Sequence, residues 1–134
     1  MCIRDRDITQ RSFQFAVRVV KLCKHLDSAA GVSRTLGNQL LRAGTSIGAN
    51  VEEAQAGQSK ADFISKLSIA NKEARETLYW LKLLLASEIV EESKLQQLCD
   101  EANQLVSILT TIIKNARENS ELGMKDKERK TENA

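Results

Sequence analysis

Apolar residues recur every three or four positions in four stretches of this 134-residue chain. That spacing places them on one face of an α-helix, whereas a β-strand would show strict alternation, which is absent here. The pattern predicts helices over about 8–29, 33–54, 59–85 and 93–116. The expected core positions are Ile8, Phe15, Val19, Leu22, Cys23, Leu26, then Leu36, Leu40, Ala43, Ile47, Val51, Ala54, then Phe63, Leu67, Ala70, Ala74, Leu78, Leu81, Leu85, and finally Leu95, Leu98, Ala102, Leu105, Val106, Leu109, Ile112, Ile113, Ala116.

Four amphipathic helices joined by short loops predict an all-α fold, an antiparallel up-down-up-down four-helix bundle over residues 8–119. The chain has no proline to break such helices. Residues 1–7 do not continue the apolar pattern, so we expect a disordered N-terminus or an artefact of translated adapter sequence. Residues 120–134 are rich in charge, with only Leu122 and Met124 as sizeable apolar groups, and are expected to form a mobile tail.

Residues that favour helix ends stand between the periodic stretches. Asp7 is a candidate N-cap of the first helix, and Gly31 is a candidate terminator at its other end. Ser33 is expected to cap the second helix, Ser59 or nearby Asp62 the third, and Ser93 the fourth.

Two glycines lie four residues apart inside the second helical pattern, at Gly44 and Gly48. Each costs the helix about 1 kcal/mol relative to alanine, so their presence favours close packing against another backbone. A phosphate-binding loop is not supported, because no strand precedes the glycines and no Gly-Lys-Ser/Thr motif follows them.

A second apolar stripe runs along the first helix beside its core face. Phe13, Val17 and Val20 stand at i, i+4 and i+7 and point away from the expected core. An exposed apolar stripe usually marks an interface, and another copy of the chain is the simplest partner. The alternative is a first helix that lies more centrally in a monomer.

Charge is distributed unevenly although the net charge is only +2. Residues 8–48 carry six basic and one acidic side chain, giving +5, whereas residues 49–101 carry six basic and ten acidic, giving −4. The basic side chains of the first helix, with two near the end of the fourth, are candidate phosphate contacts for RNA or DNA. These candidates are Arg11, Arg18, Lys21, Lys24, His25, Lys114 and Arg117.

Polar residues also line the second and third helices beside their apolar stripes. Such partly desolvated groups need partners, and the natural pairing is between the two helices. Arg42 or Lys66 would pair with Glu53 or Glu73, with bridging amide and hydroxyl groups, in a structural network rather than a small polar binding site. The network residues are Arg42, Ser46, Asn50, Glu53, Lys66 and Glu73.

The sequence offers little catalytic chemistry. It contains one histidine, His25, and three cysteines without metal-ligand spacing. No nucleophile–base pair is visible, so we expect a protein that is not an enzyme and needs no cofactor or metal. Cys23 and Cys99 fall on apolar helix faces, as buried thiols do in a reducing compartment. No apolar run reaches the length of a membrane span and no secretory signal is visible, so we expect a cytoplasmic protein.

Three segments carry a resemblance to a known family: LLRAGTSIGANVEEA at 40–54, SKADF at 59–63 and KEARETLYWL at 72–81. Over about residues 8–117 the chain resembles the bacterial four-helix bundle protein family. That family includes the proteins encoded in rRNA intervening sequences and the accessory variability determinant of diversity-generating retroelements. The residues that match its motif positions are Arg42, Ser46, Asn50, Glu53, Asp62, Lys66, Glu73, Glu76 and Trp80.

The resemblance implies a ring-like homo-oligomer, a homopentamer, with basic surface open to nucleic acid and no assigned catalytic residue. In the retroelement branch it implies a reverse transcriptase and its template RNA as partners. Two functional hypotheses follow. One is a non-enzymatic, nucleic-acid-binding accessory protein, and the other is a structural homo-oligomer or protein-interaction scaffold that binds no nucleic acid.

Overall fold

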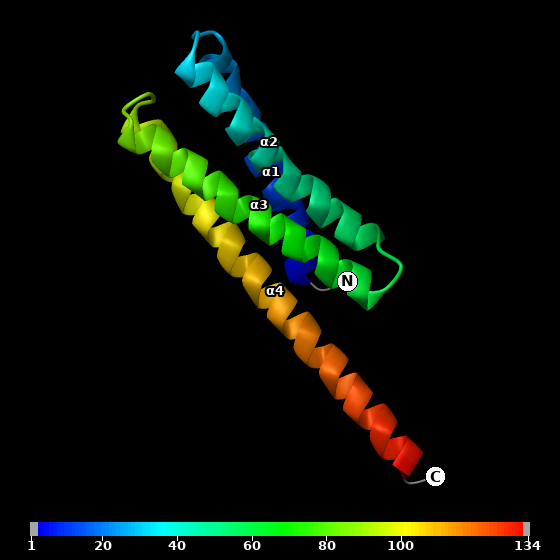
Figure 1. Ribbon diagram of the computed structural model, residues 1–134. Helices are drawn as coiled ribbons and strands as arrows, with labels where there is room; N and C mark the ends of the chain where they lie inside the picture. The colour runs from blue at the N-terminus through cyan, green and yellow to red at the C-terminus, as the bar shows by residue number, and fades with distance from the viewer. Residues whose placement is uncertain (1–2, 133–134) are drawn as a thin grey trace.

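Four helices make up the computed structural model, which describes residues 3–132. They are α1 (Ile3–Asp27), α2 (Val32–Ala56), α3 (Lys60–Ala86) and α4 (Glu92–Glu132). No strand occurs within these residues. Successive helices run in opposite directions and α4 returns to lie against α1, so the predicted up-down-up-down bundle is confirmed (Figure 1).

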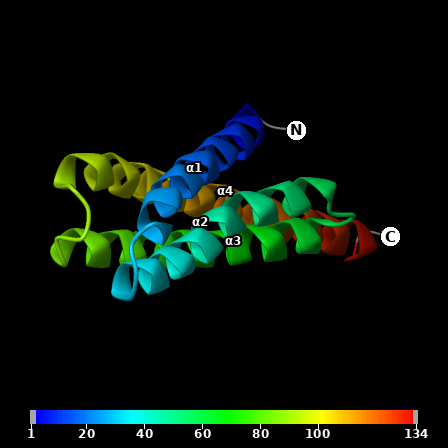
Figure 2. The same ribbon diagram turned by 90° about the horizontal axis from the view of Figure 1, so that it is seen from above.

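The helices are arranged so that α1 and α3 stand diagonally opposite each other. Each of them packs against α2 and α4, and they do not contact one another. The contact between α1 and α4 is the least extensive of the four. In Figures 1 and 2 the α1–α2 hairpin and the α3–α4 hairpin cross at an angle, and their connecting loops stand apart.

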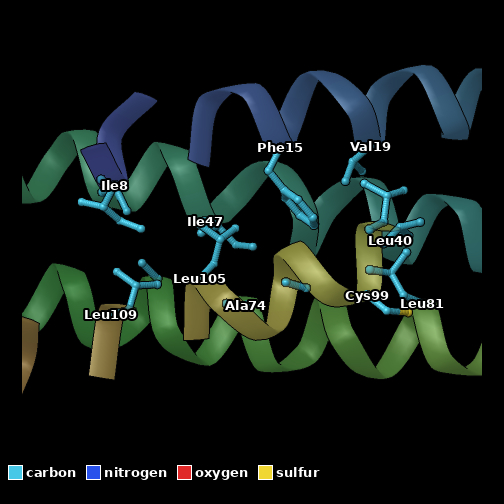
Figure 3. Close-up of a cluster of buried hydrophobic side chains, with 14 of the residues drawn as sticks. Ile8, Phe15, Val19, Leu40, Ile47, Ala74, Leu81, Cys99, Leu105 and Leu109 are labelled. Carbon is cyan, nitrogen blue, oxygen red and sulfur yellow. The ribbon is translucent and has the colours of Figure 1, made fainter. Parts of the chain in front are cut away.

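The core lies along the line where the four helices meet. Figure 3 shows side chains from all four helices converging there, including Ile8, Phe15, Ile47 and Leu105. Burying each such large side chain contributes about 1.5–3 kcal/mol. The predicted core is confirmed on every helix, although five of its members are only half-buried at the edge of the core. These five are Leu36, Phe63, Leu78, Leu85 and Val106.

The glycines of α2 allow α1 to approach closely, which confirms the packing prediction. A Cβ atom added to Gly44 would stand 2.9 Å from Val19 Cγ1. One added to Gly48 would stand 3.3 Å from the backbone carbonyl oxygen of Ser12. The backbone of α1 thus passes over Gly48 and the Val19 side chain over Gly44, and the lost helix propensity is offset by this close packing.

The helix ends match the sequence predictions in part. The Ser59 side chain accepts a hydrogen bond from the Asp62 backbone N–H at 3.1 Å, as predicted. Gly31 has a positive φ of 77°, but α1 already ends at Asp27 and Gly31 is the N-cap residue of α2, so it does not terminate α1 as predicted. The predictions for Ser33 and Ser93 are wrong, because α2 begins at Val32 and α4 at Glu92. Both serines therefore lie inside the first helical turn, past the position from which a side chain caps a helix.

Both ends of the chain are more helical than expected. Residues 3–7 belong to α1, so Asp7 is not its N-cap; its carboxylate instead lies 3.9 Å from the Arg11 guanidinium one turn later. Residues 1–2 and 133–134 lie outside the described residues.

At the other end, α4 continues to Glu132, whereas the apolar pattern predicted a helix over about 93–116. Its last buried residue is Ala116, and residues 121–131 are exposed, where α4 projects past the bundle (Figure 1). The spacings Glu121–Lys125 and Asp126–Lys130 are the i,i+4 charge pairs that sustain an exposed helix. The mobility of this segment stays a prediction.

Candidate nucleic-acid interface and polar network

Most of the predicted basic residues on α1 are exposed at its junction with α4. Arg18, Lys21 and His25 line a shallow hollow of about 330 Å³. Lys94 lines the same hollow from the start of α4, and sequence reasoning missed it because apolar periodicity does not specify the lengthwise register of α4 against α1. None of these three cationic side chains, Arg18, Lys21 or Lys94, forms a salt bridge within residues 3–132. These three side chains are therefore available to bind an anion.

Lys24 lies on a different face of α1 from this hollow. It follows Phe13, Val17 and Val20 at i+11, which places it at the end of the apolar stripe. Its exposed ammonium group thus borders the stripe and not the α1–α4 junction.

Arg11 is not a free cation. Its Nε and Nη2 donate to the two carboxylate oxygens of Glu101 at 3.0 and 2.9 Å, and Nη2 also donates to Gln104 Oε1 at 2.7 Å. The hydrogen bond to Glu101 raises the pKa of Arg11 above its usual value. This bidentate pair fastens α1 to α4 and neutralises Arg11, so Arg11 is a poorer phosphate contact than Arg18 or Lys21.

Lys114 and Arg117 are exposed, but they do not extend the basic surface of α1. They border a groove between α3 and α4 together with Arg75. Twenty residues separate Lys94 from Lys114 on one helix, which corresponds to about 30 Å. The structure therefore divides the predicted nucleic-acid contacts into two separate basic regions.

The second apolar stripe of α1 faces solvent. Phe13 is 59% exposed, and Val17 and Val20 are each 37% exposed. The core of the single chain does not cover them, which rules out the alternative that α1 is simply more central in a monomer. Their role as an oligomer interface stays a prediction.

The predicted pairing between α2 and α3 is present and centres on Arg42. Its Nη1 lies 3.3 Å from Glu73 Oε2, and its Nη2 donates to Glu76 Oε1. The Trp80 indole N–H donates to the same Glu76 oxygen at 3.4 Å. Glu76 was missed as a partner, although its position three residues after Glu73 and four before Trp80 places all three on one face of α3.

The other predicted network members do not bridge the two helices. The Ser46 hydroxyl donates to the Arg42 backbone oxygen at 2.7 Å, and the Asn50 amide donates to the Ser46 backbone oxygen at 2.8 Å. Both side chains therefore hydrogen-bond to a carbonyl one turn back in their own helix, which is the usual local alternative for serine and asparagine. Glu53 is exposed, and neither it nor Lys66 forms a salt bridge within residues 3–132.

Replacing Arg42 with alanine should lower the free energy of unfolding by about 0.5–1 kcal/mol, because Glu73 is only 14% exposed and loses its partner. Urea denaturation followed by circular dichroism measures this. The matched control is Arg34→Ala, which breaks the more exposed Arg34–Asp27 pair and should cost less than about 0.3 kcal/mol. Equal losses in the two variants would contradict a stabilising role for the network.

The described residues offer no metal centre. Among the side chains that the structure describes, those of residues 7–131, no group of three or more histidines, cysteines, aspartates or glutamates is placed to hold a metal ion. Burial raises the pKa of the Cys23 thiol to about 11, and its Sγ donates to the Gly37 backbone oxygen at 3.3 Å. Cys99 is also buried and free. These two thiols therefore serve as small core side chains.

No helix of the described chain is both long and apolar enough to cross a membrane.

The fold and site define a class: small all-α proteins built as one antiparallel four-helix bundle, with an ion-paired seam between the second and third helices. A family model described as 23S rRNA-intervening sequence protein matches residues 4–111. The chain belongs to this family.

A solved structure supports the assignment. The crystal structure of a protein of unknown function from the S23 ribosomal protein family of Bacteroides thetaiotaomicron is 42% identical, with a TM-score of 0.78. The alignment covers 84% of this chain and 99% of that one. A comparison with curated proteins finds no match.

Proposed function

We propose that this protein is a non-enzymatic, cytoplasmic RNA-binding accessory factor that acts as a homo-oligomer. The observation that carries the proposal is the set of unpaired cations at the α1–α4 junction, Arg18, Lys21 and Lys94. The family description, which names an intervening sequence of 23S rRNA, supports RNA as the nucleic acid. A reverse transcriptase is a further proposed partner, by resemblance to the retroelement branch.

Binding through such a surface would be electrostatic. Three cations from one chain neutralise few phosphates, but a ring brings several copies of the same patch to one RNA. Contacts to phosphates carry little sequence information and weaken steeply as salt rises, because counterions are released on binding. We therefore expect RNA retention at low salt, little sequence preference, and release at moderate salt.

The double variant Arg18→Glu with Lys21→Glu should abolish RNA retention. It removes two cations from the patch and adds two anions, which should weaken binding roughly a hundredfold. Filter retention of a short structured RNA at low salt measures the loss. Both side chains are exposed and unpaired, so circular dichroism should show an unchanged fold.

The matched control is Lys72→Glu with Lys82→Glu. It makes the same change in net charge at two exposed, unpaired lysines of α3 outside the patch. Binding by the patch predicts that the control retains most of its RNA. Equal loss in both variants would show that only net charge matters, and unchanged retention in the Arg18/Lys21 variant would refute the patch.

A second candidate function is a protein scaffold without nucleic-acid binding. The exposed stripe of Phe13, Val17 and Val20 favours it, because an apolar surface implies a protein partner. The two functions predict different outcomes in light scattering with added RNA. A scaffold forms the oligomer and its mass stays constant at every salt concentration, whereas an RNA-binding ring gains mass at low salt.

A further inference from the structure

A groove between α3 and α4 forms a second polar region, away from α1. It encloses about 560 Å³. Its lining includes three cations and two carboxylates beside neutral polar side chains, namely Arg75, Lys114, Arg117, Glu118, Glu121, Asn71 and Thr110. Because α1 and α3 are diagonally opposed, an oligomer built through the exposed stripe of α1 would leave this groove open.

The helix geometry brings the three cations together. Asn71 Nδ2 donates to Thr110 Oγ1 at 3.1 Å, which fixes the two helices at this level. Long helical side chains lean toward the N-terminus of their own helix. Arg75 on α3 therefore leans toward Asn71, whereas Lys114 and Arg117 on the antiparallel α4 lean toward Thr110.

These cations have no partner in the chain. Arg75, Lys114 and Arg117 are exposed, and none forms a salt bridge within residues 3–132. Glu118 and Glu121 stand one turn after Lys114 and Arg117 on α4, and neither carboxylate forms a salt bridge with them. Three cations against two carboxylates leave the groove with a net charge of +1, and a phosphodiester is an anion that guanidinium and ammonium groups recognise well.

One buried atom of the groove lacks a hydrogen bond. Asn71 Oδ1 is an acceptor without a donor. The Thr110 hydroxyl cannot supply one, because it donates to the Val106 backbone oxygen at 2.7 Å. An unpaired buried acceptor is costly, so a ligand that brings a donor to Asn71 would gain an interaction.

A phosphate group in its ionised form has no donor to offer, but the ribose next to it carries the 2′-hydroxyl. We propose that the α3–α4 groove binds the sugar–phosphate backbone of RNA. Phosphate meets Arg75, Lys114 and Arg117, and a rotation of the half-buried Asn71 amide lets Oδ1 accept from a 2′-hydroxyl. This inference rests on the proposed RNA binding, and it adds a second contact region and a preference for RNA over DNA.

Nuclear magnetic resonance titration of the full ¹⁵N-labelled chain with the tetranucleotide rU4 and its deoxy counterpart dU4 tests the groove separately from the α1 patch. At about 3.4 Å per stacked nucleotide the probe spans about 14 Å, too short to reach both regions. We expect rU4 to shift the Asn71 side-chain amide and the backbone amides of Thr110 and Lys114. Binding to rU4 should be about fivefold to tenfold tighter than to dU4, the effect of one hydrogen bond.

Two groove variants sharpen the test. Arg75→Ala with Arg117→Ala should lower the slope of log affinity against log salt by about 1.4, for two single-strand phosphate contacts. The control Lys72→Ala with Lys82→Ala should leave the slope of this local titration unchanged. Asn71→Leu should keep phosphate binding but bring rU4 and dU4 to equal affinity.

The outcomes distinguish this inference from the proposed function. Shifts confined to the region of Arg18 and Lys21 would overturn the groove and support the α1 patch. Shifts in the groove alone would support the groove and overturn the patch. Equal affinity for rU4 and dU4 in the natural chain would overturn the ribose contact, and an absence of shifts anywhere would overturn both proposals.

Discussion

Exchanging Val17 and Val20 for aspartate is expected to convert the proposed homo-oligomer into single chains of 14.9 kDa. In the single chain both side chains are 37% exposed on the outer face of α1, so the fold tolerates aspartate there. In an interface between copies, the side chains at these two positions would be buried away from solvent. Each unpaired carboxylate buried in such a contact would cost several kcal/mol, and every copy in a ring would carry two. Multi-angle light scattering of the purified variant measures the change in mass.

The control for this change is Val32→Asp. Val32 is 68% exposed in the first turn of α2, away from the stripe, where a negative charge is favourable to the helix. The control should keep the mass of the natural protein. An unchanged mass in the Val17/Val20 variant would place the interface elsewhere, and a natural protein that is already monomeric would contradict the ring itself.

The same variant connects the two proposed properties. If the ring strengthens RNA binding by presenting several copies of the basic surface of Arg18 and Lys21, the monomeric variant should bind RNA far more weakly although both residues are intact. Lys24 is the one predicted phosphate contact on the stripe face, so it would border the interface and not the RNA. On these proposals, the face of α1 with Val17 and Val20 would serve assembly, and the face with Arg18 and Lys21 would bind RNA.

The fold was predictable because each helix is specified by the spacing of apolar residues within its own stretch of sequence. A period of three to four apolar residues identifies each helix and its buried face, and short loops then leave little choice but an antiparallel bundle. The projecting end of α4 was missed for the same reason. An apolar stripe shows where a helix is packed, whereas residues 121–131 continue the helix through backbone propensity and side-chain charge without packing.

The site was predictable only where partners lie on neighbouring rows of adjacent helices. Arg42 and Glu73 were paired correctly on that basis. Arg11 was assigned to the nucleic-acid surface because its acidic partner, Glu101, lies 90 residues away in the sequence. The separation of Lys114 and Arg117 from the α1 patch likewise depends on the lengthwise register of α4 against its neighbours, which apolar periodicity does not specify.

Replacing Gly44 with leucine should lower the free energy of unfolding by about 3 kcal/mol, the upper end of the usual cost of overpacking. Even a lone Cβ at this position would stand 2.9 Å from Val19 Cγ1, and valine has little rotamer freedom with which to move aside. The helices α1 and α2 would have to separate along their closest contact. Urea denaturation followed by circular dichroism measures the loss.

Gly123 provides the matched comparison, since it lies within the projecting part of α4 and an added Cβ would meet nothing within 4 Å. Gly123→Leu should leave global stability unchanged and strengthen the local helix by up to about 1 kcal/mol. A Val19→Ala background removes the methyl groups that obstruct Gly44→Leu, so the two changes together should cost at least about 1 kcal/mol less than the sum of the single changes. Strict additivity, or equal stability of the Gly44 and Gly123 variants, would show that the close α1–α2 contact does not stabilise the bundle.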